Sequence, residues 1–274
     1  MILVDAHVHL HPEVPIGKFF DAACENFSAA AAGEENRDGF FAVLMLAEGN
    51  VNSGNLSSAP LFDDAAISGP SRFWKFKKLD ENESFLAERN DGHRLWVIRG
   101  QQIVTAEDLE VLALATDTVF RDGDSIRDVI ENVRTAGAIP VVPWGVGKWT
   151  GKRGKIIGDL ISDYRDREFF LGDNSGRPRF WRRPKHFEQS AQKGIPILPG
   201  SDPLPVVGGY LKVGSFGLSV SGTLDEKCPA ASLRSLLMDV KVILKPFGRL
   251  EDFRHFVVNQ FKMQLRKRLY KNFL

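Results

Sequence analysis

Two patterns of apolar residues alternate along the chain. Short apolar runs are typical of buried strands, whereas apolar residues that recur every three or four positions indicate helices packed by one face. The strand-like runs cover residues 2–6, 40–46, 95–104, 110–116, 139–143, 168–171 and 195–199. The helix-like segments cover residues 16–32, 125–136, 155–164, 184–192, 229–239 and 250–269. Because strands and helices alternate, we expect an α/β fold with a mainly parallel sheet, either open or closed into a barrel.

Two stretches interrupt this alternation. Residues 85–88 and 94–97 predict a hairpin, because Asn90-Asp91-Gly92 between them supplies the residues that tight turns require. Residues 50–69 are rich in Asn, Ser and Gly, and they predict a long loop after the second strand. We find neither an internal repeat nor a domain linker, so we expect one domain over residues 1–274.

The composition narrows the class of protein. With 36 basic and 35 acidic residues the net charge is +1, so bulk charge favours neither a nucleic acid nor a membrane as partner. The two cysteines, Cys24 and Cys228, form no C-x-x-C motif, so we expect reduced thiols. Asp5 and His7 interrupt the first apolar run, which therefore does not resemble a signal peptide. We expect a cytoplasmic protein.

The end of the first strand carries the most informative chemistry. Alternate residues of a strand project to one face, so His7 and His9 lie side by side, with Asp5 on the same face. Two imidazoles in this spacing can chelate one metal ion from a rigid support. The alternative is a strand end with surface histidines. The metal interpretation gains weight because His11 follows, which places three of the six histidines within five residues.

The order of several motifs resembles that of the PHP (polymerase and histidinol phosphatase) family. The opening Asp5-Ala6-His7-Val8-His9 resembles the first metal motif of that family. Residues 97–105 and 110–115 are similar to its strand that ends in Gly-x-Glu and to the strand that follows, residues 137–143 to its His-Pro segment, and residues 194–202 to its late Gly-Ser-Asp motif. The resemblance covers residues 1–205, which leaves residues 206–274 as a C-terminal extension with helices.

This resemblance implies a distorted seven-stranded β/α (TIM-like) barrel that holds up to three metal ions and hydrolyses phosphoesters. Three customary ligands are replaced: Gln102 stands for a glutamate, Trp144 follows Pro143 where a histidine is expected, and Leu204 replaces a histidine after Asp202. The matching ligands are His7, His9 and Asp202. We therefore expect one or two divalent ions (zinc, manganese or iron) rather than three.

Other polar residues are candidates for the chemistry around that ion. Asp173 follows the sixth strand and can serve as a fourth ligand or as a base, or it can simply form a turn with Asn174. Asp5 is a second candidate proton acceptor. Strand ends converge on one face of a barrel, so we expect these residues to lie together.

Two basic segments are candidates for binding a substrate. Residues 144–155 combine glycines with Lys148, Lys152 and Arg153 before a helix, a pattern that attracts anions, although a solvated loop explains it as well. Arg177 opens the basic and aromatic segment 177–183, and Trp144 is a further candidate contact. Such a segment also suits single-stranded nucleic acid, but without a wider basic surface we expect a small anionic substrate and no nucleic acid.

The leading hypothesis is a metal-dependent hydrolase, specifically a phosphoesterase. One alternative is a PHP-like barrel that has lost catalysis and binds a ligand or a partner. A further alternative is an amidohydrolase-type metal hydrolase with an eight-stranded barrel. That class needs two more histidines on middle strands, and none occurs between His93 and His186.

Overall fold

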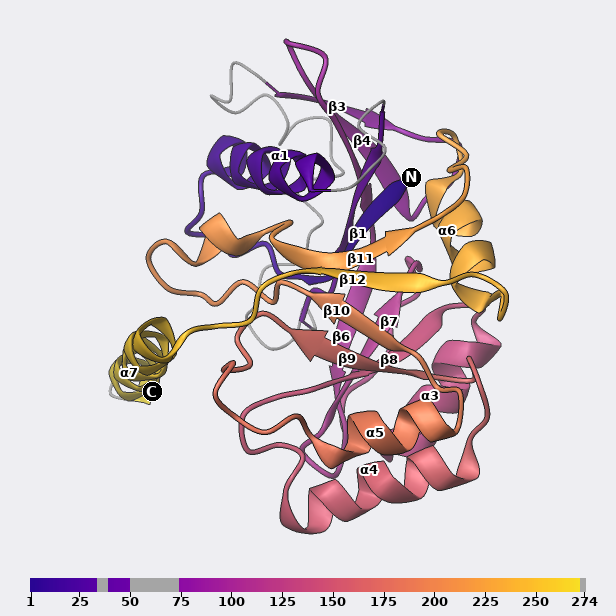
Figure 1. Ribbon diagram of the computed structural model, residues 1–274, viewed down its shortest axis with the longest axis vertical. Helices are drawn as coiled ribbons and strands as arrows, with labels where there is room; N and C mark the ends of the chain where they lie inside the picture. The colour runs from indigo at the N-terminus through magenta and orange to yellow at the C-terminus, as the bar shows by residue number, and fades with distance from the viewer. Residues whose placement is uncertain (34–38, 50–73, 272–274) are drawn as a thin grey trace.

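The computed structural model describes residues 1–33, 39–49 and 74–271, and its strands form two open sheets (Figure 1). The larger sheet has seven strands, in the order β12 (Leu244–Gly248), β11 (Phe216–Val220), β1 (Ile2–Val8), β2 (Phe41–Leu46), β5 (Arg94–Ile98), β4 (Ser84–Arg89) and β3 (Trp74–Lys78). The smaller sheet has five, in the order β10 (Ile197–Gly200), β9 (Phe170–Asn174), β8 (Ile139–Pro143), β7 (Glu110–Leu114) and β6 (Gly100–Val104). The loop expected at residues 50–69 lies outside the described residues.

The expected seven-stranded barrel is wrong, and so is the eight-stranded barrel of the amidohydrolase alternative. A β/α barrel needs parallel strands that are each followed by a helix. Here β1, β2 and β5 are parallel, as are β8, β9 and β10, but the remaining neighbours pair antiparallel. Short connections join β3, β4 and β5, and likewise β6 and β7, so these strands lack the crossover helices that would close a barrel.

The run predicted as one strand over residues 95–104 is divided between the two sheets. Arg99 separates β5 in the larger sheet from β6 in the smaller one. A side chain at Gly100 would place its Cβ 2.5 Å from the carbonyl oxygen of Leu46 and 2.6 Å from that of Ala113. Glycine is therefore required where the chain passes between the sheets, because only glycine allows so close an approach of backbones.

Several local predictions are confirmed. Strands β4 and β5 form the expected hairpin, with Phe85 opposite Val97 and Glu88 opposite Arg94. Among the described residues the helices are α1 (Ile16–Ala32), α3 (Ile126–Thr135), α4 (Gly151–Asp163), α5 (Lys185–Gln192), α6 (Pro229–Met238) and α7 (Phe253–Lys271), with a short 3-10 turn η2 (Gly209–Lys212). Each of these α-helices overlaps a helix-like segment of the sequence. Strands β3, β11 and β12 were not predicted, because their short runs mix apolar residues with Lys, Gly or Ser.

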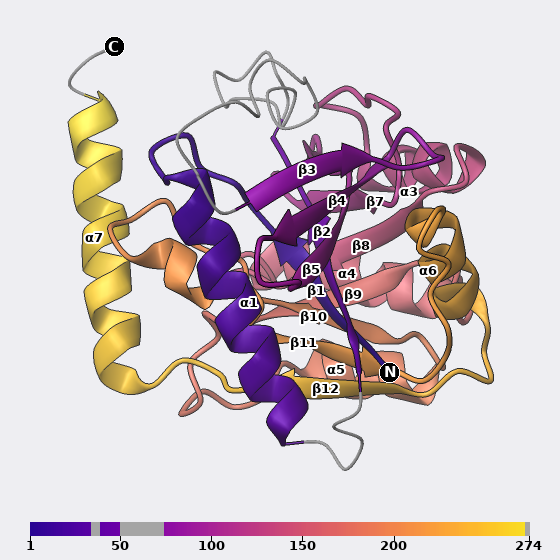
Figure 2. The same cartoon turned by 90° about the horizontal axis from the view of Figure 1, so that it is seen from above.

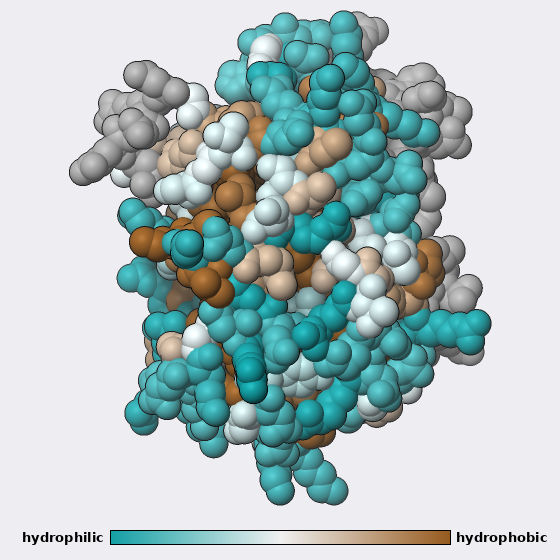
Figure 3. Space-filling view, turned by 90° about the vertical axis from the view of Figure 1, so that its right-hand side faces the viewer, coloured by the Kyte–Doolittle hydropathy of each residue, from teal (hydrophilic) through white to brown (hydrophobic). Residues whose placement is uncertain are grey.

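The apolar core lies in three layers, which the two sheets separate. Helix α1 covers the outer face of the larger sheet, where Phe20 and Phe27 pack among its strands (Figure 2). Val43, Trp96 and Phe170 belong to the layer between the sheets. Helices α3, α4 and α5 cover the outer face of the smaller sheet. Figure 3 shows that the lower part of one side of the molecule is mainly hydrophilic, as expected for the solvent side of such helices.

Helix α7 lies at one side of the molecule, away from both sheets (Figures 1 and 2). Its first residues are tied to the body through Glu251, whose backbone NH donates to the carbonyl of Ser175 at 2.9 Å. Within the described residues, no helix has both the length and the apolar character needed to cross a membrane.

Candidate metal centre

Three of the predicted ligands meet in space. The Nε2 atoms of His7 and His9 are 3.0 Å apart, and they lie 3.7 and 3.6 Å from Oδ1 of Asp202. His7 is buried, whereas His9 and Asp202 are partly accessible to solvent. Two imidazole nitrogens and one carboxylate oxygen therefore point toward a common space that a ligand can reach.

The close approach of β10 to β1 creates this arrangement. A Cβ atom at Gly200 would lie only 2.3 Å from the backbone nitrogen of His7, so glycine is required at the end of β10. Two residues later, the Asp202 backbone NH donates to the His7 carbonyl at 2.8 Å. Asp202 has a φ of 46°, in the left-handed region that non-glycine residues rarely adopt. The backbone thus holds Asp202 in an unusual conformation directly beside His7.

Asn174 orients the carboxylate of Asp202, and the sequence analysis missed this role. Its Nδ2 donates to Oδ2 of Asp202 at 3.0 Å and to the carbonyl of Trp144 at 2.9 Å. Oδ1 of Asp202 is the oxygen nearest the histidines. The sequence analysis selected the stretch Asp173-Asn174-Ser175-Gly176, but it assigned the candidate role of ligand or base to Asp173 and none to Asn174.

Asp5 lies beneath the centre rather than in it. Its carboxylate is fully buried and accepts from the backbone NH groups of Ser201 at 2.7 Å and Gly214 at 2.8 Å. Burial raises the pKa of Asp5 to about 7, although these hydrogen bonds act in the opposite direction. Both oxygens hold backbone groups, so Asp5 joins the end of β1 to the segments that follow β10 and η2.

Asp173 and Arg177 are engaged with each other. Nε and Nη2 of Arg177 donate to the two oxygens of Asp173 at 2.7 and 2.8 Å, in a bidentate pair that is largely buried. Oδ1 of Asp173 also accepts from the backbone NH of Asn174 at 3.0 Å, as the turn interpretation predicts. The Asp173 carboxylate is therefore committed to structure, and the Arg177 charge is neutralised.

The electrostatics favour a neutral imidazole at His9. Burial and the neighbouring His7 lower the pKa of His9 to about 3, although Asp202 raises it. A neutral ring is the form that coordinates a metal ion. A hydrogen bond between His9 and the Ala47 backbone also acts on this ring, and contacts of that kind orient metal-binding histidines.

Glu48 is a buried carboxyl near the centre that the sequence analysis missed. It follows β2, is 8% exposed, and accepts from the backbone NH of Leu10 at 3.0 Å. Burial raises the pKa of Glu48 to about 7. The Glu48 carbonyl accepts from the backbone NH of Gln102 at 2.8 Å, so Glu48 lies beside the position where the family pattern expects a glutamate.

Two of the three basic residues predicted to bind a substrate in segment 144–155 have other partners. Lys148 forms an ion pair with Glu110 of β7. Arg153 donates to the carbonyls of Asp108 and Gly147, at 3.2 and 3.1 Å. Lys152 is exposed in the first turn of α4. Within the described part of the chain, no hydrogen bond or ion pair connects these three side chains to the candidate ligands.

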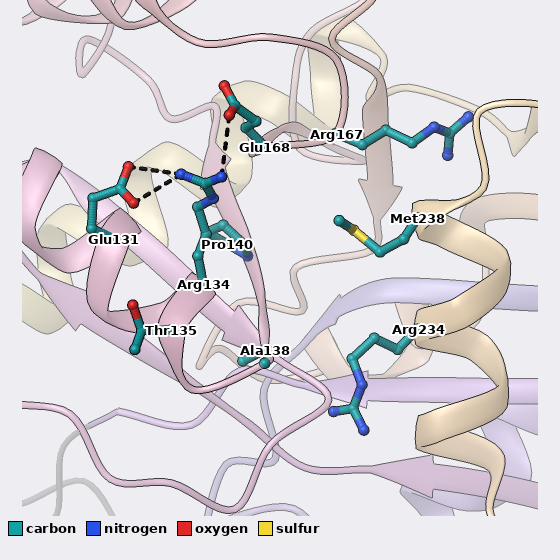
Figure 4. Close-up of a pocket in the computed structure, with 10 residues that line it drawn as sticks. Glu131, Arg134, Thr135, Ala138, Pro140, Arg167, Glu168, Arg234 and Met238 are labelled. Carbon is teal, nitrogen blue, oxygen red and sulfur yellow. Dashed lines mark hydrogen bonds and ion pairs between the residues drawn. The ribbon is translucent and has the colours of Figure 1, made fainter.

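A second group of charged residues lines a cavity of about 450 Å³ at the other end of the smaller sheet (Figure 4). Arg134 pairs there with Glu131 and Glu168. Arg167 donates to the carbonyls of Leu237 and Val242. These guanidinium groups neutralise carboxylates and cap the end of α6, so they stabilise the structure rather than offer charge to a ligand.

Comparisons with known proteins add a likeness of fold. No family model matches this sequence, and no curated protein matches it. PsfC from Pseudomonas syringae PB-5123 is similar in structure, with a TM-score of 0.54 and 13% identity over 96% of this chain and 98% of that chain. This likeness concerns the fold alone.

Two endonuclease structures are also similar. Endonuclease Q, in complex with a 27-mer duplex substrate with an abasic lesion at the active site, has a TM-score of 0.46 and 13% identity over 86% of this chain. The lesion-specific endonuclease PfuEndoQ from Pyrococcus furiosus has a TM-score of 0.47 and 13% identity over 88% of this chain. This chain covers 56% and 57% of those chains, little more than half their length, and neither likeness identifies an activity.

Proposed function

We propose that the protein is a PHP-like, metal-dependent hydrolase in which His7, His9 and Asp202 hold one divalent cation. The observation that carries this proposal is the spacing of their ligand atoms, 3.0, 3.7 and 3.6 Å. Ligand atoms at the corners of a zinc tetrahedron with bonds of about 2.0–2.2 Å stand roughly 3.4 Å apart. The donor set of two imidazoles and a carboxylate suits zinc, manganese or iron.

Three protein ligands leave a coordination position open, which is typical of catalytic rather than structural sites. A cation held by His7, His9 and Asp202 would act as a Lewis acid and would activate a water molecule as the nucleophile. The chain's own contribution is orientation: Asn174 fixes the Asp202 carboxylate, and Asp5 holds the backbone on which His7 and Ser201 lie.

We propose a small anionic phosphoester as the substrate. The order of the PHP-like motifs supports this reaction. Positive charge is also available near Trp144, because Arg182 and Lys185 line a cavity with it and have no ion-pair partner in the described part of the chain.

Metal loading and turnover test the proposal together. The purified protein is stripped with a chelator, reloaded with zinc or manganese, and assayed for bound metal and for release of phosphate from a panel of phosphomonoesters. We expect one metal ion per chain and turnover in the wild type, and loss of both in His7→Ala and Asp202→Ala. His93→Ala, at an exposed hairpin, is the matched control and retains both properties. Metal binding without turnover on any phosphoester would contradict the hydrolase proposal and favour a binding protein.

A further inference from the structure

A separate cavity of about 220 Å³ lies between the loop after β8 and the segment that leads into α5. The lining combines tryptophan, glycine and basic residues. They are Trp144, Gly145, Gly147, Trp149, Thr150, Arg177, Trp181, Arg182, Pro184, Lys185 and His186. The lining contains no acidic side chain, although Asp173 lies just behind it, paired with Arg177.

Trp181 offers a rigid aromatic surface to this cavity. It remains 40% exposed, although its ring contacts those of Trp144 at 6.3 Å and Phe256 at 5.3 Å between centroids. Phe180 packs against it from the side, also at 6.3 Å. An indole that is held by three neighbours and still exposed loses little conformational freedom when a flat ring stacks on it.

The charge of the cavity comes from Arg182 and Lys185. Both side chains are exposed and have no ion-pair partner among the described residues, whereas Arg177 is neutralised by Asp173. Burial lowers the pKa of His186, although the hydrogen bond that its Nε2 donates to the Gly154 carbonyl at 2.8 Å acts in the opposite direction. Two free cations and no acid make the cavity complementary to an anion.

The cavity adjoins the candidate metal centre through Trp144. The Trp144 carbonyl and Oδ2 of Asp202 accept from the same Nδ2 atom of Asn174, at 2.9 and 3.0 Å. These two oxygens are therefore within about 6 Å of each other. The cavity lining and the metal ligands are thus linked through the side chain of Asn174.

We propose that this cavity binds a planar aromatic group with negative charge, independently of the proposed hydrolase function. The ring lies against Trp181, and Arg182 and Lys185 contact the anion.

A pair of matched probes tests the binding. Phenyl phosphate and cyclohexyl phosphate carry the same charge, but only the first is planar and aromatic. Each is titrated against the chelator-treated protein while tryptophan fluorescence is recorded. We expect phenyl phosphate to bind about 5-fold or more tightly than cyclohexyl phosphate, since ring stacking adds affinity of this size. Equal affinities for the two probes would overturn the proposal.

Variants locate the binding in the cavity. We expect Trp181→Leu to weaken phenyl phosphate binding by about 5- to 10-fold and Trp181→Phe to restore most of it. The double variant Arg182→Ala/Lys185→Ala weakens binding similarly and reduces its salt dependence. Phe253→Leu, which alters the same aromatic cluster through Phe180 without a ring contact to Trp181, and Lys193→Ala, at the end of α5, are matched controls. An equal loss in Phe253→Leu, or no loss in Trp181→Leu, would overturn the proposal.

Discussion

The side-chain amide of Asn174 lies 3.0 Å from Oδ2 of Asp202 and connects the end of β9 to the segment that follows β10. The contact leaves Oδ1 of Asp202 facing Nε2 of His7 and of His9, at 3.7 and 3.6 Å. Residues that orient a metal ligand commonly affect metal affinity nearly as much as the ligands themselves. This contact therefore gives a direct test of the candidate metal centre.

We expect Asn174→Ala to weaken metal binding by about 10- to 100-fold, because the Asp202 carboxylate loses the hydrogen bond that orients it. The measurement is the affinity for zinc by competition with a chromophoric chelator. Asn132→Ala, on the exposed side of α3, is the control and leaves the affinity unchanged. An Asn174→Ala protein with wild-type zinc affinity would show that Asp202 is not oriented for coordination.

Gly200→Ala tests the contact between β10 and β1. The new Cβ would lie 2.3 Å from the His7 backbone nitrogen, so the two segments must separate. We expect the free energy of unfolding to fall by about 3 kcal/mol, at the upper end of the cost of overpacking. Urea denaturation of the metal-free protein measures this free energy.

Gly158→Ala is the matched control, because open space surrounds that helical glycine. Alanine is favoured over glycine in a helix by up to about 1 kcal/mol, so we expect no loss of stability there. Equal stability of the two variants would contradict the observed packing.

Glu48 predicts a pH dependence of stability. Burial raises the pKa of Glu48 from 4.5 to about 7, so between these values the folded state keeps a proton that the unfolded state releases. The folded state then binds more protons, and its stability falls as the pH rises through this window, by at most about 1.4 kcal/mol per pH unit. Well above pH 7 Glu48 is ionised in both the folded and the unfolded state, so the free energy of unfolding no longer changes with pH through this group.

The variant Glu48→Gln removes this titration. We expect its free energy of unfolding, measured in urea from pH 5 to pH 8 in the presence of a chelator, to improve relative to wild type as the pH rises toward 7. The difference then reaches a plateau. Glu188→Gln, at an exposed position on α5, provides the control. A difference between Glu48→Gln and wild type that does not change with pH would contradict the buried carboxyl.

Arg177 is predicted to act on stability through Asp173 rather than on catalysis directly. Arg177→Met leaves the buried Asp173 carboxylate without its bidentate partner, and we expect a loss of about 3–5 kcal/mol. The double variant Asp173→Leu/Arg177→Met recovers most of that loss, because no charge is left unpaired. Thermal and urea unfolding measure both proteins. If the double variant is no more stable than Arg177→Met, the pair is not the reason for the loss.

Local sequence patterns predicted many of the elements. Periodicity located α1 at its observed ends, and turn chemistry at Asn90-Asp91-Gly92 predicted the β4–β5 hairpin. The expected alternation of side chains at the end of the first strand predicted that His7 and His9 lie together, and their Nε2 atoms are 3.0 Å apart, although β1 itself ends at Val8. These features depend on interactions between residues that are close in the chain, so the sequence alone was sufficient to predict them.

Distant contacts decided the rest. Whether the strands close into a barrel depends on which edges pair, and the division of residues 95–104 at Gly100 depends on the carbonyls of Leu46 and Ala113. The bidentate pair of Asp173 with Arg177, and the amide of Asn174 on Asp202, arise only where separate loops meet. A polar side chain binds whatever partner the folded chain brings within about 3 Å. The sequence determined which groups were available at the strand ends, and the packing of two sheets determined which of them remained free to bind a ligand.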